Sequence, residues 1–317
     1  MPTETVYGLG ANALDPDASR SIYVAKGRPS DNPLIIHICD FESLEKYTNI
    51  QKSPDRELAM ALAQAFMPGP VTMILPKADI IPLVVTAGLD TVAVRFPSHP
   101  VARELIRLSG VPIAAPSANL SGSPSPTCAR HVINDLDGRI DIIVDGGACE
   151  IGLESTIIMP KNGRIKLLRP GGVTVEQLEK FAPVDADKAL TEKLESDEKP
   201  LAPGMKYRHY APKAPVAIVS GEYGEVCRFF RKMLENKNNA VLCFEEQKNE
   251  LCGLENVFVL GRRSDSDQQA RQLFDKLREI DGHNFERVYA CEPSKDGVGF
   301  AVYNRLIKAC GFEVIKL

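Results

Sequence analysis

The hydrophobic positions of this chain switch between helical and extended patterns over short distances. In the first half, apolar residues three or four positions apart predict helices, and short apolar runs bounded by Gly and Pro predict buried strands. The predicted helices span 17–26, 55–66 and 102–108, and the predicted strands span 33–38, 71–75, 91–96, 111–115, 140–144, 157–159 and 165–168. Lys161-Asn162-Gly163 predicts a hairpin turn between the last two strands. This part of the chain is therefore predicted to be mixed α/β.

A second pattern of strands alternating with helices begins after residue 215. Its predicted strands are 216–220, 240–244, 257–260 and 288–291, and its predicted helices are 225–234, 268–280 and 301–310. Strands that alternate with helices are typical of a parallel sheet. We therefore expect a small, largely parallel Rossmann-like domain.

Between the two patterns the periodicity fades, and 185–199 is dominated by charged residues. Pro203-Gly204 and Pro212 follow, which indicates a linker or an exposed helix. At 317 residues the chain is long enough for two hydrophobic cores. The predicted organisation is a first domain at 1–182, a linker at 183–213 and a second domain at 214–317.

The composition is that of an ordinary globular protein, with 44% hydrophobic and 25% charged residues. The first ten residues have no basic stretch before an apolar run, and no window of about 18 apolar residues occurs. We therefore expect a cytoplasmic protein without stable membrane association. The eight cysteines form no C-x-x-C pair and no zinc-site spacing with histidine, which favours reduced thiols.

Four cations stand out because each has Gly, Pro or apolar neighbours and not other charges: Lys26, Arg28, Arg95 and Arg169. Cations in such surroundings suit phosphate or carboxylate binding, although each one alone could equally form a surface ion pair. Hydroxyl and amide groups that could donate to phosphate oxygens lie in one Pro-rich loop: Ser117, Asn119, Ser121 and Ser125. That loop also has the composition of an ordinary turn. Together the two sets favour an anionic ligand.

Several common site motifs are missing, including the Walker phosphate loop, H-E-x-x-H, G-x-S-x-G and a helix-opening G-x-G-x-x-G. His37 ends a predicted strand, and a lone histidine there is more often structural. His209 lies in the aromatic and basic segment 207–212 of the predicted linker. That segment either anchors the linker on a domain or closes over a ligand.

The polar segments at the predicted strand ends resemble the YrdC-like family of L-threonylcarbamoyladenylate synthases, in its long two-domain form. The segments that carry the resemblance are Pro2-Thr3-Glu4-Thr5-Val6-Tyr7-Gly8, Lys26-Gly27-Arg28-Pro29, Val94-Arg95-Phe96-Pro97, residues 115–122, Glu154-Ser155-Thr156, Leu168-Arg169-Pro170-Gly171 and residues 203–212. Several ordered motifs in one chain are far more specific than any single motif.

The resemblance implies a twisted mixed sheet with an open cavity in the first domain and a smaller Rossmann-like second domain. It implies that threonine, bicarbonate or CO2, and ATP with Mg2+ are converted into threonylcarbamoyl-AMP and pyrophosphate. The product would serve N6-threonylcarbamoyladenosine modification of tRNA through downstream tRNA threonylcarbamoyl-transferase proteins. No side chain need act as a nucleophile, because the carbamate of threonine attacks ATP itself.

Carried over position by position, the resemblance also implies site residues. For threonine these are Thr5, His37, Arg95, Ala115 and Ser155. For ATP they are Lys26, Arg28, Asn32, Thr91, Ser117, Asn119, Ser125, Arg169 and, from the linker, Tyr210 or else Tyr207. Lys26 and Arg28 are expected to act electrostatically in catalysis.

Two points qualify the resemblance. The family has a strand before the Thr-Glu-Thr-Val-Tyr-Gly motif, whereas Met1 directly precedes Pro2 here, so we expect that strand to be missing. The alternative function is an RNA-binding or ribosome-associated module that uses the same cationic cavity. A net charge of −6 over residues 1–200 argues against that alternative.

Overall fold

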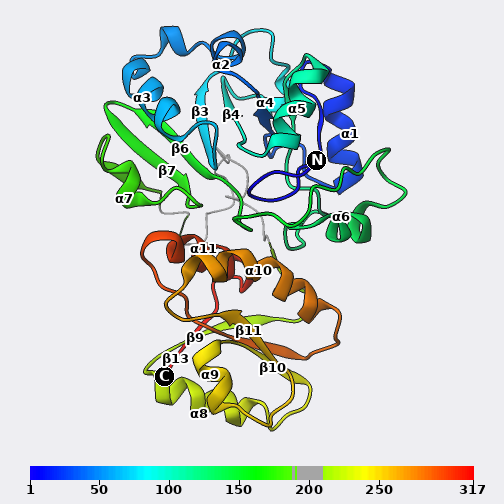
Figure 1. The fold of residues 1–317 in the computed structure, drawn as a ribbon, viewed down its shortest axis with the longest axis vertical. Helices are drawn as coiled ribbons and strands as arrows, with labels where there is room; N and C mark the ends of the chain where they lie inside the picture. The colour runs from blue at the N-terminus through cyan, green and yellow to red at the C-terminus, as the bar shows by residue number, and fades with distance from the viewer. Residues whose placement is uncertain (188–189, 191–209) are drawn as a thin grey trace. The chain divides into compact units, whose positions relative to one another are not determined.

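The computed structural model describes residues 1–187, 190 and 210–317. They form two compact units, made mainly of residues 1–190 and of residues 210–317. Each unit has its own sheet, as Figure 1 shows, and the predicted mixed α/β class is confirmed. Pro203-Gly204, Tyr207 and His209 of the predicted linker lie outside the described residues.

The N-terminal unit is built on an eight-stranded sheet with the order β1-β5-β2-β4-β3-β6-β7-β8. The sheet is mixed: β2 and β4 are parallel, whereas β3 and β4 are antiparallel. The strands are β1 (Ala11–Asn12), β2 (Ile35–His37), β3 (Val71–Pro76), β4 (Thr91–Arg95), β5 (Ile113–Ala114), β6 (Thr156–Lys161), β7 (Arg164–Arg169) and β8 (Val184–Ala186). The turn predicted between β6 and β7 is confirmed, with positive φ at Asn162 and Gly163.

Seven α-helices and one 3-10 turn connect these strands in the described part of the unit. They are α1 (Pro16–Lys26), α2 (Phe41–Tyr47), η1 (Ile50–Lys52), α3 (Arg56–Phe66), α4 (Leu83–Thr86), α5 (Pro100–Ser109), α6 (Ala129–Leu136) and α7 (Val175–Leu178). The first helix has clear sequence signals at both ends. The Asp15 side chain accepts from the N–H groups of Asp17 and Ala18, and Gly27 ends the helix at φ 60°. This left-handed cap fixes where Lys26, the last helical residue, stands.

The strand predicted at 140–144 is wrong, because no residue of that segment pairs in the sheet. Its apolar side chains Ile140 and Ile143 pack instead against the buried cluster around Tyr7 and Leu136. The backbone that follows bonds to a side chain: the N–H of Gly146 donates to the Tyr7 hydroxyl at 3.0 Å. The apolar pattern therefore marks a loop that packs only partly against the core, since Ile140 and Ile143 are half-buried and Ile142 is exposed.

At the other edge of the sheet, β8 contains residues predicted to begin the linker. Val184 pairs in parallel with Ile165 of β7, and Ala186 pairs with Leu167. The side chains of β8 are exposed or half-buried, so the strand leaves no apolar pattern in the sequence. The strand is held by backbone pairing and by the ion pair of Asp185 with Arg164 of β7.

The C-terminal unit has a five-stranded parallel sheet with the order β11-β10-β12-β9-β13, as predicted for a Rossmann-like domain. Its elements are β9 (Val216–Ser220), α8 (Tyr223–Met233), β10 (Asn239–Phe244), α9 (Glu245–Glu250), β11 (Val257–Gly261), α10 (Ser266–Asp281), β12 (Arg287–Cys291), α11 (Gly297–Ala309) and β13 (Val314–Lys316). In Figure 1, α10 and α11 cover one face of this sheet and α8 and α9 cover the other. Both faces are therefore buried, which explains the almost continuous apolar strands.

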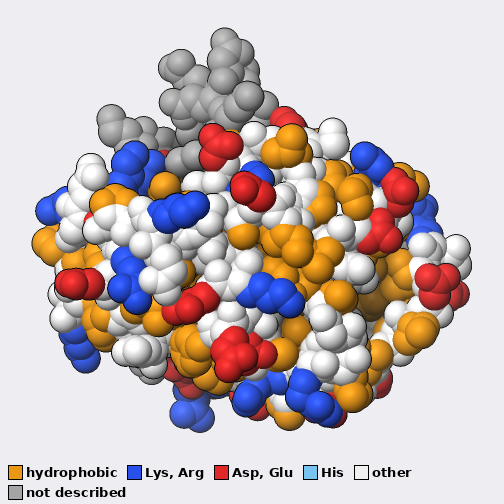
Figure 2. Space-filling model, turned by 90° about the horizontal axis from the view of Figure 1, so that it is seen from above, with side chains coloured by type: hydrophobic (Ala, Val, Ile, Leu, Met, Phe, Trp, Pro, Cys, Tyr) orange, Lys and Arg blue, Asp and Glu red, His pale blue; other side chains and the backbone are white. Residues whose placement is uncertain are grey.

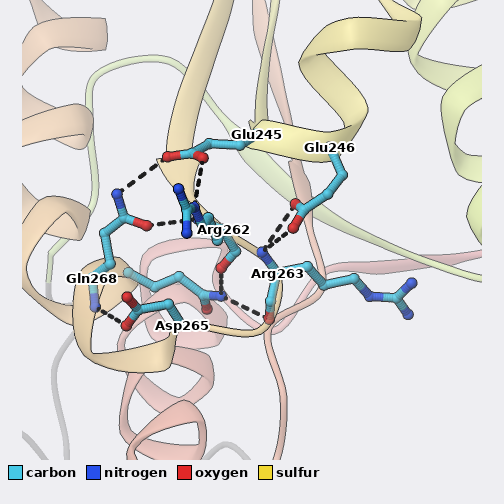
Figure 3. Close-up of polar contacts among 7 residues, drawn as sticks. Glu245, Glu246, Arg262, Arg263, Asp265 and Gln268 are labelled. Carbon is cyan, nitrogen blue, oxygen red and sulfur yellow. Dashed lines mark hydrogen bonds and ion pairs between the residues drawn. The ribbon is translucent and has the colours of Figure 1, made fainter.

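A polar network joins the carboxyl ends of β10 and β11 to the start of α10 (Figure 3). Asp265 caps the helix by accepting from the N–H of Gln268 at 2.8 Å, and the Gln268 amide accepts from the N–H of Arg262 at 2.8 Å. Glu245 receives hydrogen bonds from both Arg262 and Gln268, each at 3.2 Å. The network satisfies backbone groups where strand becomes loop, so we regard it as structural.

Two further predictions concern the chain as a whole. All eight cysteines are free thiols. Within the residues that the structure describes, no helix is both long and apolar enough to cross a bilayer.

Gly171 provides a test of the packing that follows β7. A Cβ atom at this position would lie 2.4 Å from the N of Thr156 and 2.7 Å from the O of Glu154, and both neighbours are backbone atoms that cannot rotate away. Gly171→Ala should therefore destabilise the N-terminal unit by about 1–3 kcal/mol, measured by urea denaturation. The matched control is Gly224→Ala, where nothing lies within 4 Å of the added methyl group. Equal stability of the two variants would contradict this packing.

Candidate functional site

The centre of the candidate site is a row of residues that crosses the N-terminal sheet. Arg95 at the end of β4 is paired with His37 of β2 on one side and with Thr72 of β3 on the other. The same row continues through Ile157 of β6 to Arg169 of β7. Directly paired residues in neighbouring strands project to the same face. The strand register therefore places three predicted site residues, His37, Arg95 and Arg169, in one row on the same face of the sheet.

An apolar row lies two residues away on the same face, because side chains in a strand alternate with a period of two. It consists of Ile35, Ala93 and Ile74, which are paired with one another and are all buried. They belong to one hydrophobic cluster that also contains Ile157. The site therefore begins where the apolar core of this face ends, which holds the polar row in a rigid and largely dry setting.

Arg95 is buried together with Glu4, which comes from the N-terminal loop. The Nη2 atom of Arg95 lies 2.8 Å from Oε1 of Glu4, and both side chains are about 95% buried, with exposed fractions of 5% and 4%. The contact is an ion pair between two buried side chains. Beyond this contact and the backbone N–H groups of Glu4 and Ser98 near the carboxylate, Nε and Nη2 of Arg95 and both oxygens of Glu4 make no well-aligned hydrogen bond to the described residues. Buried donors and acceptors without partners are rare in proteins and often mark a site that a ligand completes.

The charges of this group are fixed by its surroundings. Burial would raise the pKa of Glu4, but the positive charge of Arg95, together with hydrogen bonds from Arg95 and from the backbone of Glu4 and Ser98, holds the pKa below its ordinary value. Burial, and then the same positive charge, lower the pKa of His37 to about 3. At neutral pH the site therefore contains a carboxylate, a guanidinium and a neutral imidazole.

Thr72 links the row to the predicted residues Ser155 and Arg169. The hydroxyl groups of Thr72 and Ser155 are 2.7 Å apart. Arg169 donates from Nε to the carbonyl of Ser155 at 3.0 Å and from Nη2 to its hydroxyl at 3.1 Å. All three residues are buried, so this chain of hydrogen bonds fixes both predicted residues against the sheet.

The N-terminal loop connects two other loops of the site. The N–H of Ala118 donates to the carbonyl of Tyr7 at 2.8 Å, and the N–H of Gly152 donates to the carbonyl of Thr5 at 3.1 Å. Thr5 itself is fully buried, and its hydroxyl lies 2.9 Å from that of Thr3. The backbone of this loop therefore places Thr5 and Glu4 between the loop that contains Ser117 and the loop that contains Ser155.

Lys26 holds the Ser- and Asn-containing loop in place. Its Nζ donates to the carbonyl of Ser117 at 2.5 Å and also to the carbonyl of Asn119. The hydroxyl of Ser117 donates to the side-chain oxygen of Asn119 at 2.5 Å. The structure thus brings three residues predicted for ATP into direct contact at the end of α1.

Other residues predicted for ATP lie in two further contacts. Arg28 donates to the carbonyls of Asn32 and Pro33 at 3.2 and 3.0 Å. The Asn32 side chain is buried, and its Oδ1 atom has no hydrogen-bond partner. Ser125 donates to Oε1 of Glu154, and both residues are buried.

Three predicted residues lie apart from these contacts or contribute only backbone. Ala115 follows β5, and its N–H donates to the carbonyl of Ile35 at 2.9 Å. Thr91 begins β4, four residues before Arg95, a separation of about 13 Å along a strand. Tyr210 belongs to the C-terminal unit, where its buried ring lies 5.2 Å from that of Phe274.

The burial of three of the four predicted cations excludes the surface ion pairs that the sequence had left open for them. Lys26, Arg95 and Arg169 have exposed fractions of only 3–5%, so they do not form surface ion pairs. Sequence reasoning missed Glu4, Thr72 and Glu154. Glu4 could have been found, because it too is a charged residue among apolar and small neighbours. Thr72 had no such signal, since it is one hydroxyl within an apolar strand.

Comparison with known proteins gives a consistent result over the whole chain. Residues 1–171 match the Sua5, YciO and YrdC family, which is described under telomere recombination. Residues 173–311 match the C-terminal domain of threonylcarbamoyl-AMP synthase. Threonylcarbamoyl-AMP synthase of Bacillus subtilis is 49% identical over 318 residues, covering 100% of this chain and 90% of that protein. The Pyrococcus abyssi enzyme is 46% identical over 325 residues, covering 100% of this chain and 91% of that protein.

A solved structure agrees with these matches. The crystal structure of Pyrococcus abyssi Sua5 complexed with L-threonine has a TM-score of 0.89 at 45% identity. The match covers 100% of this chain and 91% of the solved chain. Both units of the present chain therefore have counterparts in one protein.

The neutral state of His37 predicts a pH dependence of stability. A histidine whose pKa is about 3 when folded and about 6.5 when unfolded contributes stability that is complete above pH 6.5 and is lost as the pH falls toward 3. Between pH 6.5 and 5 the N-terminal unit should lose stability with a slope approaching about 1.4 kcal/mol per pH unit. Urea denaturation should show a smaller slope for His37→Gln.

The control for this measurement is His283→Gln, which changes an exposed histidine of the C-terminal unit. It should leave the slope of the N-terminal transition unchanged. A wild-type protein whose stability is flat between pH 6.5 and 5 would contradict the buried, neutral imidazole.

Proposed function

We propose the function from one premise: the chain belongs to the threonylcarbamoyl-AMP synthase family in its two-domain form. It is a nucleotidyltransferase that makes threonylcarbamoyl-AMP and pyrophosphate from L-threonine, bicarbonate or CO2, and ATP. The product serves N6-threonylcarbamoyladenosine modification of tRNA. We infer that downstream transferase proteins take up the intermediate, which they would then move to the tRNA.

One observation carries the threonine site, namely the buried Arg95, whose Nε and Nη2 make no well-aligned hydrogen bond to the described residues beyond the contact with Glu4. A guanidinium is suited to bind a carboxylate through two parallel hydrogen bonds. The carboxylate of threonine would supply the missing acceptors. His37 and Ser155, on the same face of the sheet, would then line the rest of the threonine site, together with Thr5 and the backbone at Ala115.

On the ATP side, Lys26, Arg28 and Arg169 would offset the negative charge of the phosphates, and Ser117, Asn119, Ser125 and Asn32 would bind polar atoms of the nucleotide. The carbamate forms when the neutral amine of threonine adds to CO2. Its oxygen then attacks the α-phosphorus of ATP, the bond to the β-phosphate breaks, and pyrophosphate leaves. The protein accelerates this step by positioning and electrostatics.

We expect Mg2+ to enter with ATP. This ion keeps several waters and is commonly held by substrate phosphates with one or two carboxylates. Glu154 is an acidic side chain in contact with a predicted ATP residue, Ser125, and could supply such a ligand. When bound, the ion would offset charge on the phosphates.

The alternative RNA-binding function lacks a broad basic surface on the face that Figure 2 shows. There, Lys and Arg side chains are interspersed with Asp and Glu and with apolar patches. Phosphate-backbone binding depends on neutralising many phosphates at once, which requires gathered cations. The observed charge distribution therefore favours a small anionic substrate.

The decisive experiment measures pyrophosphate release by the full chain. Release should require ATP, L-threonine and bicarbonate together, and omission of any one should abolish it. RNA binding without this release would support the alternative function instead. A panel of other amino acids would test whether threonine is the preferred substrate.

Arg95→Lys tests the carboxylate contact while leaving Glu4 a cationic partner. Because an ammonium cannot form the two-pronged contact of a guanidinium, the KM for threonine should rise at least about tenfold, which corresponds to about 1.4 kcal/mol. The KM for ATP should change by less than about threefold, because the lost contact would contribute to the binding of threonine and not to that of ATP. The matched variant Arg28→Lys should show the opposite pattern. If Arg95→Lys changed both KM values equally, Arg95 would not belong to the threonine site.

A further inference from the structure

The buried side chains of Glu4 and Arg95 bring opposite charges together at the end of β4. Glu4 reaches Arg95 from the N-terminal loop, and the two charges are 2.8 Å apart and almost fully buried. Nevertheless, apart from their mutual contact and the backbone N–H groups of Glu4 and Ser98, the two carboxylate oxygens and two of the guanidinium nitrogens make no well-aligned hydrogen bond to the described residues. The two charges therefore offset each other, but the hydrogen-bonding capacity of the two side chains is not fully used.

A ligand that completed both halves would need an anionic group for Arg95 and a cationic donor for Glu4. A single anion would satisfy Arg95 but would place a second negative charge beside Glu4. An α-amino acid in its zwitterionic form carries both groups on one carbon atom. The neutral His37 adds no charge that would disturb this match.

We propose that Glu4 is the residue that binds the ammonium group of threonine, while Arg95 binds its carboxylate. This inference rests on the proposed threonine site and assigns a role to a residue outside it. Glu4 is ionised at neutral pH, since its pKa lies below the ordinary value. Burial strengthens both contacts, because charges interact more strongly away from water. Because both side chains are buried, threonine can reach them only if the site opens around Glu4 or Arg95.

The assignment concerns the binding step. Carbamate formation needs the neutral amine, so the ammonium proton must leave after threonine has bound. Glu4 would thus fix the position of the nitrogen before it reacts. We assign Glu4 no part in removing the proton.

The test compares ligands that lack one group each, with binding to the full chain measured by calorimetry. 3-Hydroxybutyrate lacks the amine of threonine, and threoninol lacks its carboxylate. Glu4→Gln should weaken the binding of threonine and threoninol at least about tenfold, since a charged hydrogen bond becomes a neutral one. Its effect on 3-hydroxybutyrate should be less than about threefold in either direction. An equal loss of affinity for threonine and 3-hydroxybutyrate would overturn the proposal and leave Glu4 as a structural partner of Arg95.

Glu4→Gln leaves Arg95 buried without a counter-charge and could fail to fold. The wild-type protein provides a second measurement. If Glu4 pairs with the ammonium group, threonine affinity should fall as the pH rises through the pKa of the threonine amine, whereas 3-hydroxybutyrate affinity should stay constant. Parallel pH profiles for the two ligands would overturn the proposal. Pyrophosphate release by the wild-type protein is independent of both outcomes, so the assigned function and this inference can fail separately.

Discussion

A buried guanidinium at the end of an inner strand must have a counter-charge, and this requirement shapes the N-terminal unit. Arg95 ends a strand whose preceding residues are buried and apolar. Removing such a charge from water costs several kcal/mol unless a partner of opposite sign is close. Glu4 meets the requirement from a loop of a different part of the chain. The loop must therefore lie across the end of the sheet, and its backbone bonds then fix the neighbouring loops.

Many of the regular elements could be predicted from the sequence, because burial and secondary structure produce the same pattern there, but the helices α2, α4, α6, α7 and α9 were not predicted. The helix 17–26 was found from its apolar spacing and its Gly27 cap, and four of the five parallel strands of the C-terminal unit, all except β13, were found from nearly continuous apolar runs. Prediction failed where the two diverge. Ile140 and Ile143 pack against the core without forming a strand, while Ile142 is exposed, and β8 is a strand without an apolar face.

The candidate site, too, could be predicted from the sequence only in part. Cations with apolar neighbours marked the places where charge is buried, because the sequence shows directly that no other charge dilutes them. The register that aligns His37, Arg95 and Thr72 could not be read from the chain, since it depends on which strands become neighbours. The strand β3 lies between β4 and β6 in the sheet although β5 follows β4 in the sequence. Partners such as Thr72 therefore become visible only in three dimensions.

The fixed ionisation of Glu4 and His37 has a consequence for how the molecule responds to its medium. One group is held as an anion by a neighbouring cation and the other is held neutral by burial, so neither changes its charge near neutral pH. The charges of these two residues are therefore constant near neutral pH, where CO2 and bicarbonate interconvert by hydration and loss of a proton. Acidity would then regulate the reaction through the supply of its reactants, with the protein acting as an electrically rigid template.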